Sequence, residues 1–161
     1  SLYRCLERPV NISEEGRYFC VYDNRIHEDG GYAYYTDDWI WDSYRAAHPL
    51  RILTDRKKHT DIIRSFLRMS EFSSDHWFPN FPEVTGDSRR MNCNHGVSVI
   101  ADAWYKGVRD FDLQKAYTYT KAAIEEKTLA PWSSAKAGWI DRFYKEKGYP
   151  VIGIGRTGNG A

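Results

Sequence analysis

Cysteine is scarce in this sequence, and neither sign of charge predominates. The three cysteines, Cys5, Cys20 and Cys93, are odd in number and show no C-x-x-C spacing. This pattern argues against a cysteine-rich zinc site and favours buried free thiols. Lys and Arg together number 23 against 22 Asp and Glu, so the bulk charge indicates neither a nucleic acid nor a membrane surface as partner.

Several motifs are also absent. The sequence contains no apolar run of roughly eighteen residues, the length that a membrane-spanning helix needs. It has no G-x-S-x-G, no Walker loop, no Rossmann fingerprint and no pair of histidines with H-x-x-x-H spacing. We therefore expect no membrane span and no nucleotide site, and the pattern identifies no metal ligands.

Aromatic residues, in contrast, are abundant. The 161 residues fit a single compact domain, and Phe, Trp and Tyr make up 16% of them, with six Trp and twelve Tyr. Such a surplus suits stacking on sugars or bases, and it equally suits a bulky core. The chain opens as if inside a helix, without a signal peptide, and closes in a glycine-rich stretch at residues 153–161, so we expect a segment of a longer protein.

Helical periodicity predominates from residue 37 onward. Capping and stop signals bound most of the helices, and Pro49 predicts a kink or break near His48 in the first of them. The predicted helices are residues 37–53 capped by Thr36 or Asp37, 56–71 capped by Thr54 or Asp55, 95–107, one beginning at Asp112, and 136–147 ended by Gly148 and Pro150. The predicted class is therefore mainly α, with the helices in antiparallel pairs.

Two segments fall outside this helical pattern. Residues 17–23 and 32–35 alternate like strands, and turn residues lie between them at 27–31, which predicts a short β-hairpin excursion near the N-terminus. Residues 72–93 contain prolines, a glycine and several small polar residues, and predict a long loop. Three aromatic residues in this loop indicate that it is packed and ordered: Trp77, Phe78 and Phe81.

The stretch TDDWIWDSYRAAHP mixes large aromatic residues with charged ones. Asp38, Asp42 and Arg45 are separated by four and three positions, so in a helix they share one face, and Trp41 lies four positions before Arg45. This face could hydrogen-bond sugar hydroxyls and stack on a pyranose ring. The same residues also suit a helix N-terminus, where Asp37 and Asp38 complement the dipole and Asp42 pairs with Arg45. Spacing alone leaves both interpretations open.

A second candidate is NCNHG, residues 92–96, where the loop becomes a helix. Exposed amides at a helix start bind anions or hydroxyls, and His95 could act as a base, a ligand or a donor. Asn94 as an N-cap and His95 as a structural histidine explain the same residues without a ligand. Carboxylates for the pair that glycoside hydrolysis needs are also present, at separations that the sequence does not set: Asp37, Asp38, Asp42, Glu83 and Asp102.

Three ordered stretches make the sequence resemble a known family. They are YYTDDWIWDSYRAAHPL, DIIRSFLRMSE and HWFPNFPEVTGDSRRMNCNHGVSVIADAWYKGVRDFDLQKAY. The family pattern has a W-D-T-F/Y-R-x-x-H-P-L helix, a G-W-L-P-x-W-P loop, a G-x-H-A-type turn and an I-A-D-A-x-x-K-G-x-x-D-F-D run. The upstream RPVNISEEGRYFCVYDNRIHEDGG is similar to the family's approach to that helix. Over essentially its whole length the chain resembles glycoside hydrolase family 92, the calcium-dependent exo-acting α-mannosidases.

This resemblance implies a fold and an activity. Family members have an N-terminal β-sandwich and an (α/α)6 toroid catalytic domain, with the active site between them. Residues 1–161 would form part of the toroid, while the β-sandwich domain and the C-terminal half of the toroid would be missing. The parent protein would be an inverting, calcium-dependent α-mannosidase that removes non-reducing-end mannose from N-glycans or mannans.

The resemblance also implies partners and a location. The partners would be a mannose-containing glycan and the remainder of the polypeptide, with no nucleic acid, and the protein would be secreted, periplasmic or at the cell surface. The family's general acid and base lie in H-M-H-E-V-like and G-N-E-D-like motifs, neither of which occurs here. We therefore expect no catalytic residue in this chain, and we expect the ligands of the parent's Ca²⁺ to lie mostly outside it.

Five residues take roles from the resemblance. Asp42 and Arg45 match the W-D-x-x-R part of the helix and would hydrogen-bond the mannose in the −1 subsite. Trp41 would shape that pocket. Asn94 and His95 would approach it from the turn before the next helix.

Two departures from the family pattern affect this pocket. Gly96 stands where Ala is common, and HWFPNFP replaces the G-W-L-P-x-W-P loop, so the resemblance does not fix the aromatic wall of the pocket or the linkage specificity. Three interpretations follow: a segment of an active α-mannosidase, a non-catalytic carbohydrate-binding relative, or a purely structural helical domain with aromatic packing.

The absence of the acid and base motifs leads to a test on the isolated chain. We expect the 161 residues alone to hydrolyse no aryl α-mannoside, because the carboxylate pair that inverting hydrolysis needs lies elsewhere in the family pattern. The measurement is release of the aryl group with and without added Ca²⁺, with the full-length parent as positive control. Clear calcium-dependent turnover by the isolated chain would contradict this placement of the catalytic groups.

Overall fold

The computed structural model describes residues 2–91, 94–128, 130, 133 and 135–149. This part of the chain contains seven helices and six short strands, which confirms the mainly α class. The helices are α1 (Leu2–Leu6), α2 (Ile40–Ser43), α3 (Ala47–Thr54), α4 (Arg56–Phe72), α5 (His95–Tyr105), α6 (Leu113–Glu126) and α7 (Trp139–Lys147). The strands are β1 (Val10–Asn11), β2 (Arg17–Cys20), β3 (Arg25–Glu28), β4 (Tyr35–Thr36), β5 (Pro82–Glu83) and β6 (Gly86–Asp87).

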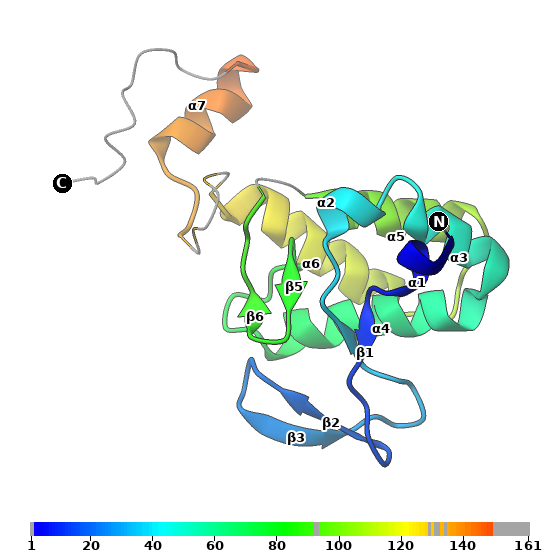
Figure 1. Ribbon diagram of the computed structural model, residues 1–161. Coiled ribbons are helices and arrows are strands. Elements are labelled where there is room, and N and C mark those ends of the chain that lie inside the picture. Colours follow the sequence, from blue (N-terminus) through cyan, green and yellow to red (C-terminus); the bar gives the residue numbers. More distant parts are fainter. Residues whose placement is uncertain (1, 92–93, 129, 131–132, 134, 150–161) are drawn as a thin grey trace.

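The body of the molecule is built on α4. This helix packs against α3, α6 and β4, while α5 packs against α3 and α6 (Figure 1). Its apolar stripe supplies the centre of the core, where Ile62, Ile63 and Phe66 are fully buried. Each such burial stabilises the fold by about 1.5–3 kcal/mol relative to an exposed side chain. By contrast, α7 projects away from the body (Figure 1).

Two predicted caps begin their helices as expected. Asp55 precedes α4, and its Oδ1 accepts a hydrogen bond from the backbone N–H of Lys58 at 3.0 Å. Asp112 precedes α6, and its Oδ1 accepts from the N–H of Lys115 at 2.9 Å. Each bond satisfies one of the first-turn amides that have no partner within the helix.

The last described helix ends where expected but begins later. Gly148, at a φ of 77°, ends α7, and its N–H donates to the carbonyl oxygen of Tyr144 at 2.8 Å. The helix begins at Trp139 and not at residue 136. The reason is local: the Asp141 carboxylate accepts a hydrogen bond from the N–H of Gly138 at 2.8 Å, which places the first turn there.

The single helix predicted over residues 37–53 is in fact two helices. Because α2 ends at Ser43 and α3 begins at Ala47, the break lies earlier than the predicted position near His48. Proline lacks an N–H, and its ring clashes with the carbonyl four residues before it in a helix. Pro49 therefore occupies the first turn of α3, where its missing N–H is not needed.

The strands pair differently from the prediction. The partner of β2 is β3, with Tyr18 opposite His27 and Cys20 opposite Arg25, so the segment predicted as a turn contributes to a strand. Asn24, with a φ of 57°, closes the turn instead, in the left-handed conformation that Asn tolerates. The hairpin near the N-terminus is thus present, while β4 pairs with β1.

Asp37 and Asp38 do not cap α2, which corrects another expectation. Trp39 occupies the N-cap position and makes no side-chain cap hydrogen bond. Asp37 Oδ1 instead accepts from the N–H of Val84 at 2.8 Å, which joins the start of α2 to the turn between β5 and β6. Asp38 is fully buried. Its burial requires a charged or hydrogen-bonding partner inside the protein.

That partner is a buried row of histidines. His48 Nε2 lies 2.7 Å from Asp38 Oδ2, and His48 Nδ1 lies 3.3 Å from His59 Nε2. Burial raises the pKa of Asp38, but the interactions with His48, Ser43 and Arg51 together outweigh it, and the pKa lies below its usual value. Burial, together with the electrostatic effects of His48 and Arg51, lowers the pKa of His59 to about 3. We call Asp38, His48 and His59 the buried polar row.

The long loop is packed, as expected. Trp77, Phe78 and Phe81 are at most 4% exposed, and the loop contains the short β5–β6 hairpin. Asp87 holds the hairpin to the aromatic segment, since its carboxylate accepts from the backbone N–H of Phe81 at 2.8 Å.

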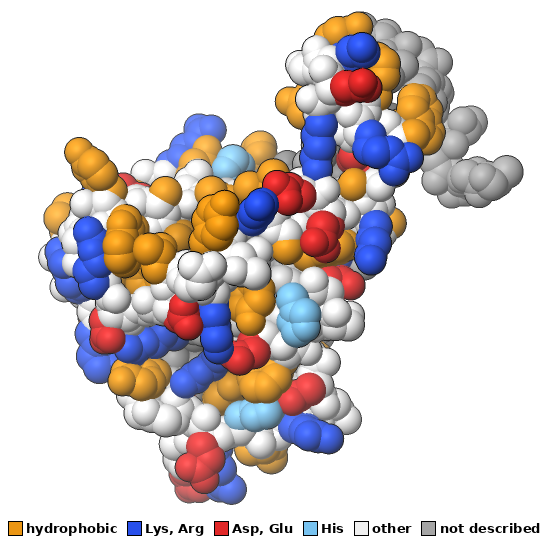
Figure 2. Space-filling model, turned by 180° about the vertical axis from the view of Figure 1, so that it is seen from behind, with side chains coloured by type: hydrophobic (Ala, Val, Ile, Leu, Met, Phe, Trp, Pro, Cys, Tyr) orange, Lys and Arg blue, Asp and Glu red, His pale blue; other side chains and the backbone are white. Residues whose placement is uncertain are grey.

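The surface shows no segregation of charge on the side drawn in Figure 2, where acidic and basic side chains alternate over the body. None of the helices in the described ranges is both long enough and apolar enough to span a bilayer.

The buried polar row predicts an acid-sensitive fold. The pKa of His59 is about 3 in the folded protein against an ordinary 6.5, so between these pH values the unfolded chain binds a proton that the folded chain does not. The free energy of unfolding should therefore fall on acidification by up to about 1.4 kcal/mol per pH unit from this group. Asp38 acts in the same direction, because a lowered carboxyl pKa stabilises the fold above its unfolded value and loses that contribution as the pH falls.

The measurement is urea unfolding at several pH values between about 7 and 4. His59→Gln should flatten the pH dependence, whereas His76→Gln, at an exposed position, should keep the slope of the unsubstituted chain. An identical slope in the His59 variant would show that this histidine is not held neutral by the fold.

Candidate functional site

Trp41 of α2, Tyr44 directly after it and His95, the first residue of α5, form an aromatic cluster. The rings of Tyr44 and His95 are stacked, with centroids 3.9 Å apart and an angle of 4° between their planes. The Trp41 ring centroid lies 5.2 Å from that of His95, at an angle of 57°. Two predicted site residues therefore meet here. Tyr44 was missed, although its spacing of three from Trp41 was a signal for it.

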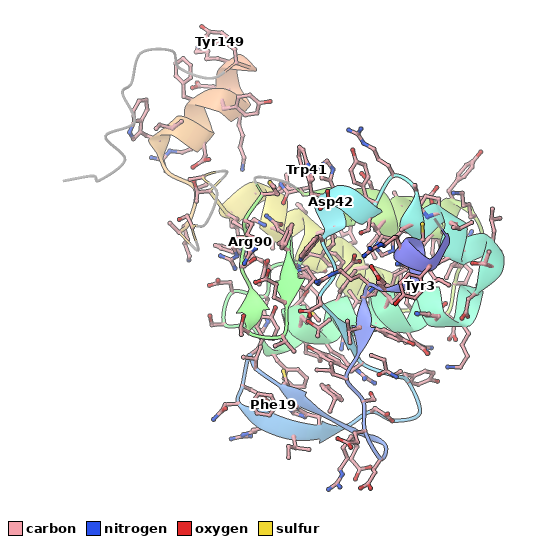
Figure 3. All side chains as sticks on the ribbon, in the orientation of Figure 1. Tyr3, Phe19, Trp41, Asp42, Arg90 and Tyr149 are labelled. Carbon is pink, nitrogen blue, oxygen red and sulfur yellow. The ribbon has the colours of Figure 1, made fainter. Side chains whose placement is uncertain are left out.

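The exposure of the cluster makes it available to a ligand. Trp41 is 43% exposed, and Figure 3 shows it beside Asp42 on the outer side of α2. An indole with one free face can stack on a sugar ring, since pyranose C–H groups form an apolar surface.

Arg45 joins the same cluster. Its Nε donates to the Tyr44 hydroxyl at 2.7 Å, and its guanidinium carbon lies 5.3 Å from the centroid of the Tyr44 ring. Burial lowers the pKa of His95, and the nearby charge of Arg45 lowers it further. The imidazole is therefore neutral at pH 7, with one nitrogen that donates and one that accepts.

Asp42 and Arg45 have different surroundings. It borders a cavity of about 360 Å³ between α1, α2 and α3, and Arg45 is not among the residues that line it. Neither residue forms an ion pair with the other, although both belong to the described chain. The predicted shared face is thus lost for Arg45, because α2 ends at Ser43 and the i, i+3 geometry does not continue.

The cavity beside Asp42 has polar walls. Asp38 contributes a carboxylate whose Oδ1 is buried without a hydrogen-bond partner, and Arg51 contributes two guanidinium nitrogens in the same condition, Nε and Nη1. The remaining residues that line it are Arg4, Cys5, Glu7, Arg8, Trp39, Ser43, Ala46 and Ala47. Buried polar atoms without partners favour a hydroxylated ligand, a water molecule or another polar segment at this place.

Asn94 occupies the predicted N-cap position of α5 without making the cap. Its side chain forms no cap hydrogen bond, and its Oδ1 is buried with no partner. It lines a small cavity together with Asn80 and Thr120, away from the aromatic cluster. An unsatisfied carbonyl oxygen of this kind costs about 1–3 kcal/mol. The space beside it is too small for a water molecule, so the structure offers no ligand position there.

The segment expected to form an aromatic wall is part of the core instead. Phe78 contacts Phe66 of α4 edge to face, with centroids 5.8 Å apart, and Phe81 stacks on Trp39 at 5.7 Å. With both rings almost fully buried, neither offers a face to a sugar. At this site the exposed aromatic side chain is Trp41 of α2.

Sequence comparison gives a family for this arrangement. The model of the glycosyl hydrolase family 92 catalytic domain matches residues 1–159. The chain belongs to glycoside hydrolase family 92. A search of curated protein sequences gives no match.

Solved structures of family 92 enzymes share the fold. The α-mannosidase BT3965 of Bacteroides thetaiotaomicron matches with a TM-score of 0.77 and 27% identity over 92% of this chain and 19% of that chain. Its complex with mannoimidazole matches with a TM-score of 0.71 and 29% identity, over 76% of this chain and 16% of that chain. The inverting mannosidase BT2199 of B. thetaiotaomicron VPI-5482 matches with a TM-score of 0.73 and 22% identity, over 94% of this chain and 20% of that chain. The chain thus spans about a fifth of the length of these relatives.

Gly96, one of the departures from the family 92 pattern, has a structural reason. A Cβ at this position would lie 2.4 Å from Cδ1 and Cε1 of Phe78. Since the Phe78 ring is buried, it has little room to move aside. The first turn of α5, and with it His95, therefore rests directly on the aromatic loop.

This contact predicts that Gly96→Ala destabilises the fold. We expect the free energy of unfolding to fall by roughly 1–3 kcal/mol, the usual cost of an overpacked core, even though Ala favours a helix over Gly. Urea unfolding measures the difference, and Ser98→Ala at an exposed position of the same helix is the matched control. A Gly96→Ala chain that is more stable than the original would contradict the close packing.

Proposed function

We propose that the chain is part of the catalytic domain of an inverting, calcium-dependent α-mannosidase. The observation that carries the proposal is the family 92 match over residues 1–159, together with the likeness to an α-mannosidase over 92% of the chain. On this proposal the helices of the body belong to an (α/α)6 toroid, and the β-sandwich domain and the rest of the toroid lie elsewhere in the polypeptide. The substrate is a non-reducing-end mannose of an N-glycan or mannan, and the protein is secreted, periplasmic or at the cell surface.

On this proposal the aromatic cluster and the residues beside the cavity both bind the sugar in the −1 subsite. Trp41 presents an exposed ring face on which a pyranose can stack. Asp42 is exposed and accepts hydrogen bonds from sugar hydroxyls, and the absence of an ion pair with Arg45 leaves its carboxylate available. Arg45 and His95 belong to the same cluster as Trp41, so they can donate to hydroxyls of a sugar stacked on its ring.

Asn94 takes a secondary place in this proposal. Its unpaired Oδ1 is buried beside a space too small for a water molecule, so a contact with the ligand requires the start of α5 to move. Asn94 immediately precedes His95, so the start of α5 positions both residues.

The described residues do not suit Ca²⁺. One group of three or more His, Cys, Asp or Glu side chains lies close enough to share an ion in the described part of the chain, and it contains a thiol and an imidazole. Calcium prefers six to eight oxygen ligands. We therefore propose that the calcium ligands, like the general acid and base, come from the remainder of the polypeptide.

Replacement of Asp42 by Ala in the full-length parent tests the proposal. Hydrogen bonds to charged groups contribute about 1.5–3 kcal/mol, so kcat/KM for an α-mannoside should fall by roughly 10- to 100-fold. The melting temperature should not change, because Asp42 is exposed and unpaired. Asp110→Ala, which removes an exposed carboxylate paired to Arg64, is the control for loss of a surface charge.

Two results would count against this role. Unchanged turnover with lowered stability would make Asp42 a structural residue. If the unsubstituted parent binds the sugar without hydrolysing it, the parent protein is a non-catalytic carbohydrate-binding relative.

A further inference from the structure

The β2–β3 hairpin brings together a thiol, a carboxylate and an imidazole. Side chains alternate between the two faces of a hairpin, and Cys20 lies on the inner face with Tyr18, while Phe19 is exposed on the outer one. His27, opposite Tyr18, projects on the same inner face. Asp23 belongs to the turn that connects the strands.

The three groups already contact one another. Asp23 Oδ2 lies 2.8 Å from His27 Nε2, and one potential ligand atom from each of the three side chains lies within 4.8 Å of the other two. Two ligands of a tetrahedral Zn²⁺ ion are separated by about 3.5 Å, as follows from metal–ligand distances of about 2.0–2.3 Å. Side-chain rotations that move the ligand atoms by about an ångström would therefore bring the three groups around an ion. The strands themselves would not have to move.

The surroundings hold each ligand in place. The His27 ring lies against Phe72, with centroids 4.4 Å apart, and against Tyr18 at 5.7 Å. The second carboxylate oxygen of Asp23 accepts from the backbone N–H of Arg25 at 3.2 Å, which leaves Oδ2 directed at His27. Ligands oriented by neighbouring groups in this way bind metal more tightly.

The sulfur is also set up as a ligand. Cys20 is fully buried, and burial raises the pKa of its thiol, which disfavours a free thiolate. A bound metal ion would supply the positive charge that stabilises the thiolate, which is the form that binds metal.

The donor set selects the metal. A sulfur, an imidazole nitrogen and a single carboxylate oxygen match the borderline-soft ion Zn²⁺, whereas Ca²⁺ and Mg²⁺ require mostly oxygen ligands. No fourth His, Cys, Asp or Glu among the described residues belongs to the group. Asp23 and His27 are each about one quarter exposed in their side chains, so water can reach the open position.

We propose that Cys20, Asp23 and His27 form a zinc site whose fourth position is taken by water. The ion would hold the turn of the hairpin to both of its strands, while Phe72 of α4 packs on the His27 ring. The site is separate from the proposed sugar site, because the hairpin that carries Phe19 and the helix that carries Trp41 lie at opposite ends of the body (Figure 3). The spacing C-x-x-D-x-x-x-H was the sequence signal.

The test is metal binding by the full-length parent, stripped of metals and reloaded with excess Ca²⁺. We expect Zn²⁺ to bind and to raise the melting temperature, and Co²⁺ in its place to give the near-ultraviolet charge-transfer absorption of a cobalt–thiolate bond. Cys20→Ser should remove this absorption and weaken zinc binding by about tenfold or more. Cys5→Ser, at a partly buried cysteine outside the group, should change neither measurement.

His27→Gln provides a second test in case the Cys20 variant does not fold. Its side chain is partly exposed, so the variant should fold and bind zinc about tenfold more weakly or worse. Zinc affinity equal in the parent, Cys20→Ser and His27→Gln, or no thiolate absorption in the folded parent, would overturn the proposal. Neither measurement uses a mannoside, so its outcome does not depend on the proposed hydrolase activity.

Discussion

The buried contact between Asp38 and His48, continued to His59, determines how the helices around α2 fit together. These three side chains come from the start of α2, from α3 and from α4, and each is at most 1% exposed. A buried carboxylate without its partner would destabilise the fold by several kcal/mol, so the row is stable only when all three elements are in place. Apolar packing alone would tolerate small shifts of α2; a chain of directed hydrogen bonds does not.

The position of Trp41 and Asp42 follows from this constraint. A helix of four residues has no stability of its own, because one turn costs more conformational entropy than its hydrogen bonds return. Contacts from outside the helix hold it, among them Asp38 on its buried side and the stack of Tyr44 on His95. The sugar-binding surface that we propose is therefore carried by a segment whose geometry is set almost wholly by its neighbours.

Local signals were sufficient for the longer helices and insufficient for this region. The capping aspartates of α4 and α6 and the glycine after α7 act within one turn of the chain, so the sequence predicted their positions well. Asp38 has the same local appearance as a capping residue. Its burial depends on His48, ten positions later, and on tertiary packing that no spacing rule contains.

The same limit applied to the strands and to the polar groups near them. The pairing of β1 with β4 joins Val10 to Thr36, far apart in the chain, and was not predicted. The separation of Asp42 from Arg45 depends on where α2 ends, which Pro49 controls indirectly by requiring a new helix start. The meeting of Cys20 with His27 depends on the register of the hairpin, which the turn at Asn24 sets.

The buried polar row and the cavity beside Asp42 share one residue. Asp38 binds His48 through Oδ2, while its Oδ1 has no partner and borders the cavity, where the Arg51 guanidinium also has unpaired nitrogens. Arg51 in turn donates to the carbonyl oxygens of Cys5 and Arg8, which ties α1 to α3. A ligand that enters the cavity and donates a hydrogen bond to Asp38 Oδ1 would stabilise the carboxylate whose other oxygen, bound to His48, holds α2 in place. Binding at this cavity and stability of the helical body are therefore coupled through one side chain.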